Sequence, residues 1–245
     1  MTEFFQQVVS GLALGSIYAA LALALVLIHR ATGVINFAQG EMAMFTTYIA
    51  SALMVSHDFP YWVAFFVTLA IAFVGGVTLQ RVVIRPVEQA SILTIVIVTI
   101  GLVVLLWLFF EFTKIGLAMR AAALNPDASR LVGVRVGWML GIGWGLAAVL
   151  GAVAGMLAAP TVFLEPNMMQ GILIFAFASA VLGGIDSPFG AVAGGLMLGV
   201  GLNLVGNYVD FVGSDLRLPV ALLVILIVLL VRPAGLFGKP VTRRV

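Results

Sequence analysis

Amide and carboxylate side chains gather beside two glycines early in the sequence, where their polar atoms could bind a solute. Gly33 and Gly40 bracket Asn36 and Gln39, and Glu41 stands at the head of an apolar run. Glycines beside amides favour a break in a helix, and broken helices expose the backbone donors and carbonyls that line substrate sites in membrane transporters. Asn36, Gln39 and Glu41 are therefore candidates for a translocation path. The alternative is an interfacial loop with Glu41 near a helix N-terminus, and the arginine before this stretch favours it.

A second polar stretch, residues 113–136, could bind a protein partner. It holds four of the chain's twelve Lys and Arg residues, although long apolar runs flank it. Residues 118–124 favour a helix, and the Asn-Pro-Asp sequence that follows is typical of the start of a second helix. Two short helices with a sharp corner favour a docking surface over an ordinary basic loop. The residues predicted to form this surface are Arg120, Asn125, Pro126, Asp127, Arg130 and Gly133.

The sequence lacks the patterns that catalytic and metal sites require. It has no Cys for thiolate ligands, and His29 and His57 are too isolated to form a metal pair. It has no phosphate-binding loop. Asp186 is expected to cap a helix rather than act as an acid. No predicted span carries paired carboxylates or a charge at its centre, which disfavours an intramembrane enzyme and an ion-coupled carrier. We therefore expect no catalytic residue, no metal and no cofactor bound by this chain.

Composition indicates that one membrane domain, residues 1–245, must position these segments. Hydrophobic residues make up 63% of the chain and charged residues 9%, whereas soluble domains carry roughly 25% charged residues. A helix needs roughly 20 apolar residues to cross the hydrocarbon core. The charge-free windows that approach or exceed this length are 8–28, 59–80, 89–110, 136–164, 166–185 and 187–209. Two shorter windows, 42–56 and 218–231, could span with help from snorkelling flanks. The predicted fold is an all-α bundle of about eight transmembrane helices.

Basic residues predict how the chain is oriented, because basic loops stay in the cytoplasm. They cluster at 29–30, 81–85, 114–135 and 232–244, whereas the connection near His57 and Asp58 is close to neutral. The N-terminus is predicted to lie outside and the C-terminus in the cytoplasm. Since the N-terminus lacks the basic region of a signal peptide, the first span is expected to be retained.

One window breaks this alternation of spans. If residues 89–110 form one span that starts in the cytoplasm, segment 113–136 would lie outside. Keeping it inside needs two crossings, and 22 residues cannot supply two helices of roughly 20 residues each. A re-entrant hairpin is one explanation, although exposed irregular backbone is costly in lipid. The favoured explanation is that residues normally present near 101–103 are absent from this chain.

Small residues recur at four-residue spacing, which lets helices approach closely in lipid. The favoured interpretation is simple packing within the bundle, and the alternative is a translocation path or a subunit interface. The sets with this spacing are Gly11, Gly15 and Ala19; Ala147, Gly151 and Gly155; Gly190 and Gly194; and Gly195 and Gly199.

Three ordered motifs resemble a known family. The first joins GLALGSIYAALAL at 11–23 to GVINFAQGE at 33–41, the second is GLAMRAAALNPDASRLVG at 116–133, and the third is AVLGGIDSPFGA at 180–191. They resemble branched-chain amino acid ABC transporter permeases, closest to the LivH type, over nearly the whole chain. The resemblance implies an inner-membrane importer in which this permease pairs with a second permease. A periplasmic substrate-binding protein and two ABC ATPase subunits, which hold ATP and Mg²⁺, complete the assembly.

Within this resemblance, residues 118–134 fit the cytoplasmic coupling segment that docks on an ATPase. Members of the family are usually longer by some tens of residues, and the shortfall falls between residues 100 and 104, where the count of spans fails. Urea and short-chain amide permeases share much of the pattern and remain an alternative. Neither nucleic acid nor a metal is expected as a partner.

Overall fold

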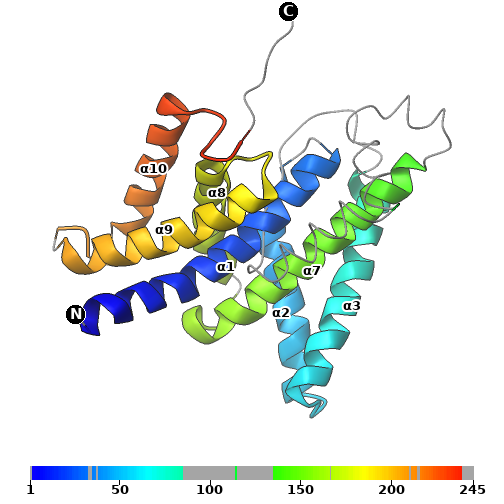
Figure 1. Cartoon of the computed structure of the whole chain (residues 1–245). Helices are drawn as coiled ribbons and strands as arrows, with labels where there is room; N and C mark the ends of the chain where they lie inside the picture. The colour runs from blue at the N-terminus through cyan, green and yellow to red at the C-terminus, as the bar shows by residue number, and fades with distance from the viewer. Residues whose placement is uncertain are drawn as a thin grey trace, which may run out of the picture.

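The computed structural model describes residues 2–32, 35–36, 38–84, 114, 135–165, 167–209, 211–213 and 216–238. These residues form α-helices and one short π-helix with no strand among them, which confirms the all-α class (Figure 1). The helices are α1 (Thr2–Thr32), α2 (Gln39–Val55), α3 (Tyr61–Leu79), α7 (Val136–Val162), α8 (Met168–Gly183), α9 (Pro188–Tyr208) and α10 (Arg217–Val231). The π-helix η1 (Gln80–Ile84) continues α3. The window 89–110 and the predicted docking residues lie outside the described residues.

Four of the described helices, α1, α3, α7 and α9, are long and apolar enough to cross a membrane. Helices α8 and α10 are apolar but shorter. Their lengths of 16 and 15 residues correspond to about 24 and 22 Å at the rise of an α-helix. They therefore need a locally thin bilayer or snorkelling flanks to span it.

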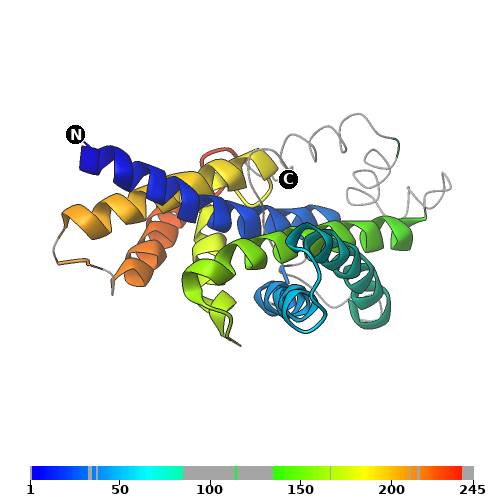
Figure 2. The same cartoon turned by 90° about the horizontal axis from the view of Figure 1, so that it is seen from below.

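Helix α1 forms the centre of the bundle. It packs against α9 on one side and α7 on the other, and α8 covers it from a third (Figures 1 and 2). The side chains from Ala19 to Ile28 are almost completely buried. Helices α2 and α3 lie beyond α7, on the side of α7 away from α9, and α10 packs at the edge against α8 and α9. Burial on all sides fits the apolar sequence of residues 19–28 of α1, which have no polar face.

The ends of α1 and α3 and the start of α7 meet at one end of the bundle, which we call the basic end. Ala31 of α1 packs against Leu140 of α7, and the guanidinium of Arg81 lies 3.6 Å from the centre of the Trp138 ring. The chain therefore leaves α3 and enters α7 at the same end. This geometry agrees with the prediction that Arg81 and Arg135 lie on the same side of the membrane.

The turn between α8 and α9 also lies at the basic end. Asp186 does not cap α9, so that prediction is wrong: the hydroxyl of Ser187 accepts the bond from the N–H of Gly190 at 3.0 Å. Asp186 instead lies 3.3 Å from Nε2 of His29 in α1. Residues after α10 return to this turn, where Leu236 N–H donates to the carbonyl of Leu182 at 2.8 Å. The small turn residues, with Gly184 at φ +110°, allow this close approach.

Candidate functional site

The interface of α7 with α2 and α3 contains several buried polar side chains. The buried face of α3 repeats every fourth residue and is continued by Gln80 of η1. The facing side of α7 consists of small residues, so the backbones meet closely: a Cβ added at Gly76 would lie 2.6 Å from the carbonyl oxygen of Trp144. We call this interface the α7 groove; its buried polar side chains include Gln39, Thr47, Thr68 and Gln80, and Trp144 adjoins it through its backbone carbonyl.

Gln39 lies in the first turn of α2 and is completely buried against α7. Its Nε2 donates to the carbonyl oxygen of Ala147 at 2.9 Å. A Cβ at Gly151 would overlap the same amide group, so only glycine leaves room for it there. Its Oε1 has no hydrogen-bond partner among the described residues. One acceptor of Gln39 thus remains open inside the bundle, where a buried polar atom without a partner is costly.

Asn36 holds the break between α1 and α2 that the flanking glycines predict. Its Oδ1 accepts from the N–H of Ala38 at 3.0 Å, and its carbonyl accepts from the N–H of Gln39 at 3.0 Å. Its Nδ2 lies 3.3 Å from the sulfur of Met42. These local bonds are typical of an Asn that shapes a turn. Asn36 therefore places Gln39 at the start of α2.

Glu41 lies in the first turn of α2 but is exposed, two residues along the helix from the buried Gln39. The structure therefore brings Asn36 and Gln39 together and leaves Glu41 on another face. An acidic residue in a first turn stabilises the helix through its dipole. A contact of Glu41 with a solute stays a prediction.

Three further polar side chains in or beside the groove were not predicted from the sequence. Gln80 is completely buried, and neither amide atom has a hydrogen-bond partner in the described part of the chain. Its Oε1 would lie 3.3 Å from a Cβ at Gly141. The hydroxyl of Thr68 and the indole Nε1 of Trp144 are likewise buried without a partner in that part. The four-residue repeat that runs from Thr68 of α3 to Gln80 of η1 is the sequence signal that could have found these two side chains.

The groove offers neutral hydrogen-bonding groups in an apolar wall. Amides, a hydroxyl and an indole can bind a polar solute or water, whereas they provide no proton-transferring or charge-compensating group. Among the described residues no group of His, Cys, Asp and Glu could hold a metal ion. Gln80 faces Gly141 and Thr47 faces Gly155, and the rise between those two glycines is about 21 Å along α7. The polar atoms are thus spread over most of the length of a membrane span.

The six residues predicted to couple to an ATPase, Arg120, Asn125, Pro126, Asp127, Arg130 and Gly133, all lie outside the described residues. Two neighbours locate the segment that carries them. It enters α7 after Arg135, which is exposed. Its C-terminal end therefore lies at the basic end of the bundle, beside Arg81.

Comparison with known proteins gives one family. The sequence model described as branched-chain amino acid transport system / permease component matches residues 7–104 and 88–231. The high-affinity branched-chain amino acid transport system permease protein LivH of Escherichia coli (strain K12) is 28% identical over 306 residues, with 99% of this chain and 98% of the relative covered. BraD of Pseudomonas aeruginosa is 28% identical over 313 residues, with the same shares covered. A probable LivH of Methanocaldococcus jannaschii is 29% identical over 152 residues, covering 60% of this chain and 47% of that protein. No solved structure matches the chain.

The comparisons also support the prediction, made from the count of spans, that this chain lacks residues that its relatives have. The alignment to the Escherichia coli protein runs over 306 positions, whereas this chain has 245 residues, so the relative carries some tens of residues without a counterpart here. The family match divides into two parts that overlap at residues 88–104, a stretch that includes the predicted shortfall between residues 100 and 104. The matched residues nevertheless span almost the whole chain, from α1 to α10. The chain therefore belongs to the branched-chain amino acid transport system permease component family.

Proposed function

We propose that this chain is the transmembrane permease subunit of an ATP-binding-cassette importer for branched-chain or related amino acids in the inner membrane. The observation that carries the proposal is the family match, which includes both the α7 groove and the segment before α7. The groove supports a passive path, because its buried polar groups are neutral and spread along α7. A chain without a charged coupling site needs an external energy source.

The partners follow from this role. Two ABC ATPase subunits would supply ATP hydrolysis with Mg²⁺, a second permease would complete the path, and a periplasmic substrate-binding protein would deliver the amino acid. The basic end faces the cytoplasm in this proposal, since basic loops are retained there. The N-terminus then lies outside and the C-terminus inside. The junction of segment 113–136 with α7 at the basic end supports a docking role for this segment.

The coupling role is tested by reversing charges in that segment. The double variant Arg120→Glu, Arg130→Glu should lower ATP-dependent leucine uptake by about 100-fold in reconstituted complex, because like charges at a docking surface cost several kcal/mol. Co-purification of the ATPase and uptake of radiolabelled leucine into proteoliposomes are measured together. Arg232→Glu makes the same kind of change on another exposed arginine of the basic end and serves as the control.

Two results would count against the proposal in different ways. Normal assembly and uptake with both arginines reversed would show that the segment does not couple the ATPase. A wild-type complex that binds ATPase but moves no branched-chain amino acid would contradict the substrate assignment. In that case urea and short-chain amides are the next solutes to assay.

A further inference from the structure

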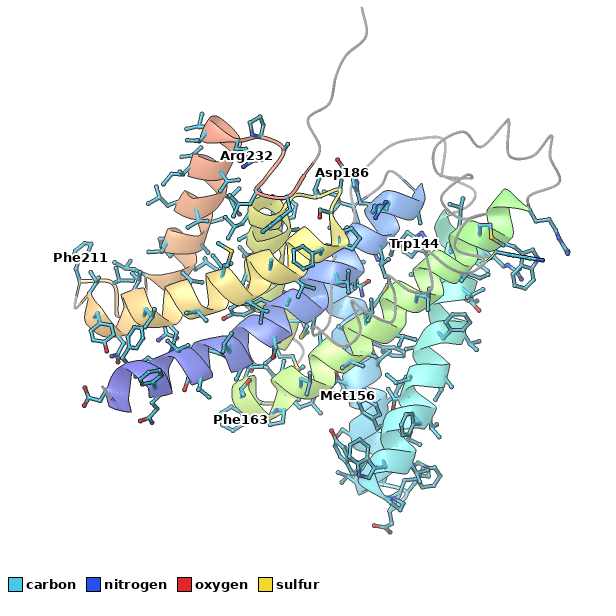
Figure 3. All side chains as sticks on the ribbon, viewed as in Figure 1. Trp144, Met156, Phe163, Asp186, Phe211 and Arg232 are labelled. Atoms are coloured by element: carbon cyan, nitrogen blue, oxygen red, sulfur yellow. The ribbon has the colours of Figure 1, made fainter. Side chains whose placement is uncertain are left out.

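A cavity of about 200 Å³ lies between α2, α3 and α7 at the end opposite the basic end. Met54 and Ser51 of α2, Tyr61 and Phe65 of α3, and Met156 of α7 contribute to its wall. Figure 3 shows Met156 and Phe163 at the far end of α7 from Trp144. The wall is apolar over most of its area and consists of thioethers and aromatic rings, which adapt to the shape of an aliphatic group.

Polar atoms are confined to one side of this cavity. Thr47 and Ser51 lie one helical turn apart on α2, so both hydroxyls face the same way. Thr47 donates to the carbonyl of Ala43 at 2.8 Å, which leaves its oxygen lone pairs able to accept. On α7, Pro160 has no N–H to donate to the carbonyl of Met156, and both residues line the cavity. In membranes, backbone groups freed in this way are tolerated where they line a cavity.

The backbone at the mouth of the cavity is held in an unusual conformation. Helix α7 ends at Phe163, which has φ +60° and ψ 154° and is 80% exposed. The next residue, Leu164, lines the cavity. Few residues other than glycine adopt a positive φ, and such strain clusters at ligand sites and switch regions. A residue with a positive φ therefore stands directly beside the cavity residue Leu164.

Thr47 belongs both to the wall of the cavity and to the α7 groove. Thr47 lines the cavity and also packs against Gly155, where an added Cβ would overlap its hydroxyl. Gly151, one turn earlier on the same face of α7, adjoins the Gln39 amide. Thr47 and Gln39 are eight residues apart on α2, a rise of about 12 Å. Gln39, with its open acceptor, therefore lies on the same helix and the same α7-facing side as the cavity residue Thr47.

We propose that this outer cavity binds the aliphatic side chain of the transported amino acid and contributes to its selection within the permease. The proposal rests on the proposed function. A cavity of about 150 Å³ with aliphatic and aromatic walls accommodates benzene, so this one has room for a branched side chain. The hydroxyls of Thr47 and Ser51 and the carbonyl of Met156 would meet the polar end of the amino acid. No ionised group of the described residues lines the cavity.

The experiment changes the size of the cavity in both directions. Ser51→Leu fills it, and Ala52→Leu adds a similar side chain at the next residue, which is exposed and outside the lining. In proteoliposomes with the complete transporter, Ser51→Leu should lower the ratio of leucine to valine uptake by about ten-fold, because one methylene in an apolar pocket discriminates by this order. Ala52→Leu should leave the ratio unchanged. Ser51→Ala separates loss of the hydroxyl from the added volume.

A second variant keeps the test decisive if Ser51→Leu does not fold. Met156→Ala enlarges the cavity and should raise uptake of phenylalanine relative to leucine by about ten-fold. Unchanged ratios in both variants, with wild-type ATPase stimulation by the binding protein, would overturn the proposal and leave the cavity to a lipid chain or to packing. If the wild-type complex transports no amino acid at all, it is the proposed function that fails.

Discussion

Small residues at four-residue spacing form both the α7 groove and the contact between α1 and α9, which we call the α1–α9 seam. The two regions differ in whether their polar side chains have hydrogen-bond partners. In the seam, Gly11, Gly15 and Ala19 of α1 pack on Gly195 and Gly199 of α9. A Cβ at Gly11 would lie 2.7 Å from the Cα of Val200, and one at Gly195 would lie 2.5 Å from the Cα of Ala19. The two backbones are in contact and leave no space between them. These glycines confirm the packing role predicted from their spacing.

The amide side chains of the seam have hydrogen-bond partners. Nδ2 of Asn203 donates to the backbone oxygen of Gln7 at 2.7 Å and to its Oε1 at 2.8 Å. Nε2 of Gln7 donates to Oδ1 of Asn207 at 3.2 Å. In the α7 groove, by contrast, Gln39 keeps one open acceptor and both amide atoms of Gln80 lack partners within the described chain.

This difference indicates a structural role for the seam and makes the groove a candidate translocation path. A satisfied polar network specifies one arrangement and rigidifies it, which suits the seam at the centre of the bundle. An unsatisfied buried amide lowers stability, so a sequence without a functional need for it would replace it by an apolar residue. Departures from local consistency occur mainly at functional sites. The groove is therefore a stronger candidate than the seam for a functional site.

The largest expected loss of stability comes from a substitution that disrupts the seam. Gly195→Leu places a side chain where even a Cβ overlaps Ala19, and such overpacking should destabilise the fold by about 3 kcal/mol. Gly201→Leu is the matched control on the same helix, because a Cβ there has nothing within 4 Å. Thermal unfolding of the detergent-purified protein measures both. Equal melting temperatures would show that the seam is looser than this contact implies.

A smaller effect is expected from the polar network of the seam. Asn203→Leu keeps a similar volume but removes the donor of two bonds and leaves the acceptors of Gln7 without it. The expected loss is about 2 kcal/mol. Asn207→Leu removes an exposed bond to the same Gln7 side chain and should cost much less. If both variants unfold at the same temperature, burial of the network does not determine its contribution.

Much of the fold follows from the sequence because lipid imposes simple requirements. The apolar windows predict the helices, and α1 differs only by continuing to Thr2 and Thr32 beyond the window 8–28. The glycines around Asn36 predict the break before α2. The alternation of basic loops predicts that α3 ends where α7 begins, and the contact of Arg81 with Trp138 confirms it.

The groove could be predicted only in part, because burial depends on how each helix is rotated about its axis. Gln80 is the last residue of the window 59–80 and precedes Arg81, so the sequence predicts that it lies at the membrane surface. In the structure it packs against Gly141 and is buried. The sequence places Trp144 in an ordinary apolar span and does not show that its Nε1 lacks a partner in the described structure. Asp186 and Ser187 are both good caps by residue type. The bond to His29 and the geometry of the turn decide between them.

The last prediction is that one substitution in the groove raises stability and lowers transport. Gln80→Leu replaces an amide that has no partner among the described residues by an apolar side chain of similar size, so the free energy of unfolding should rise by about 1 kcal/mol. Leucine uptake by the complete transporter should fall, because the basic-end part of the groove loses its hydrogen-bonding groups. This sign is opposite to that of Asn203→Leu, in which stability falls. A Gln80→Leu protein that is less stable and transports normally would show that the amide is structural, and the contrast between groove and seam would no longer hold.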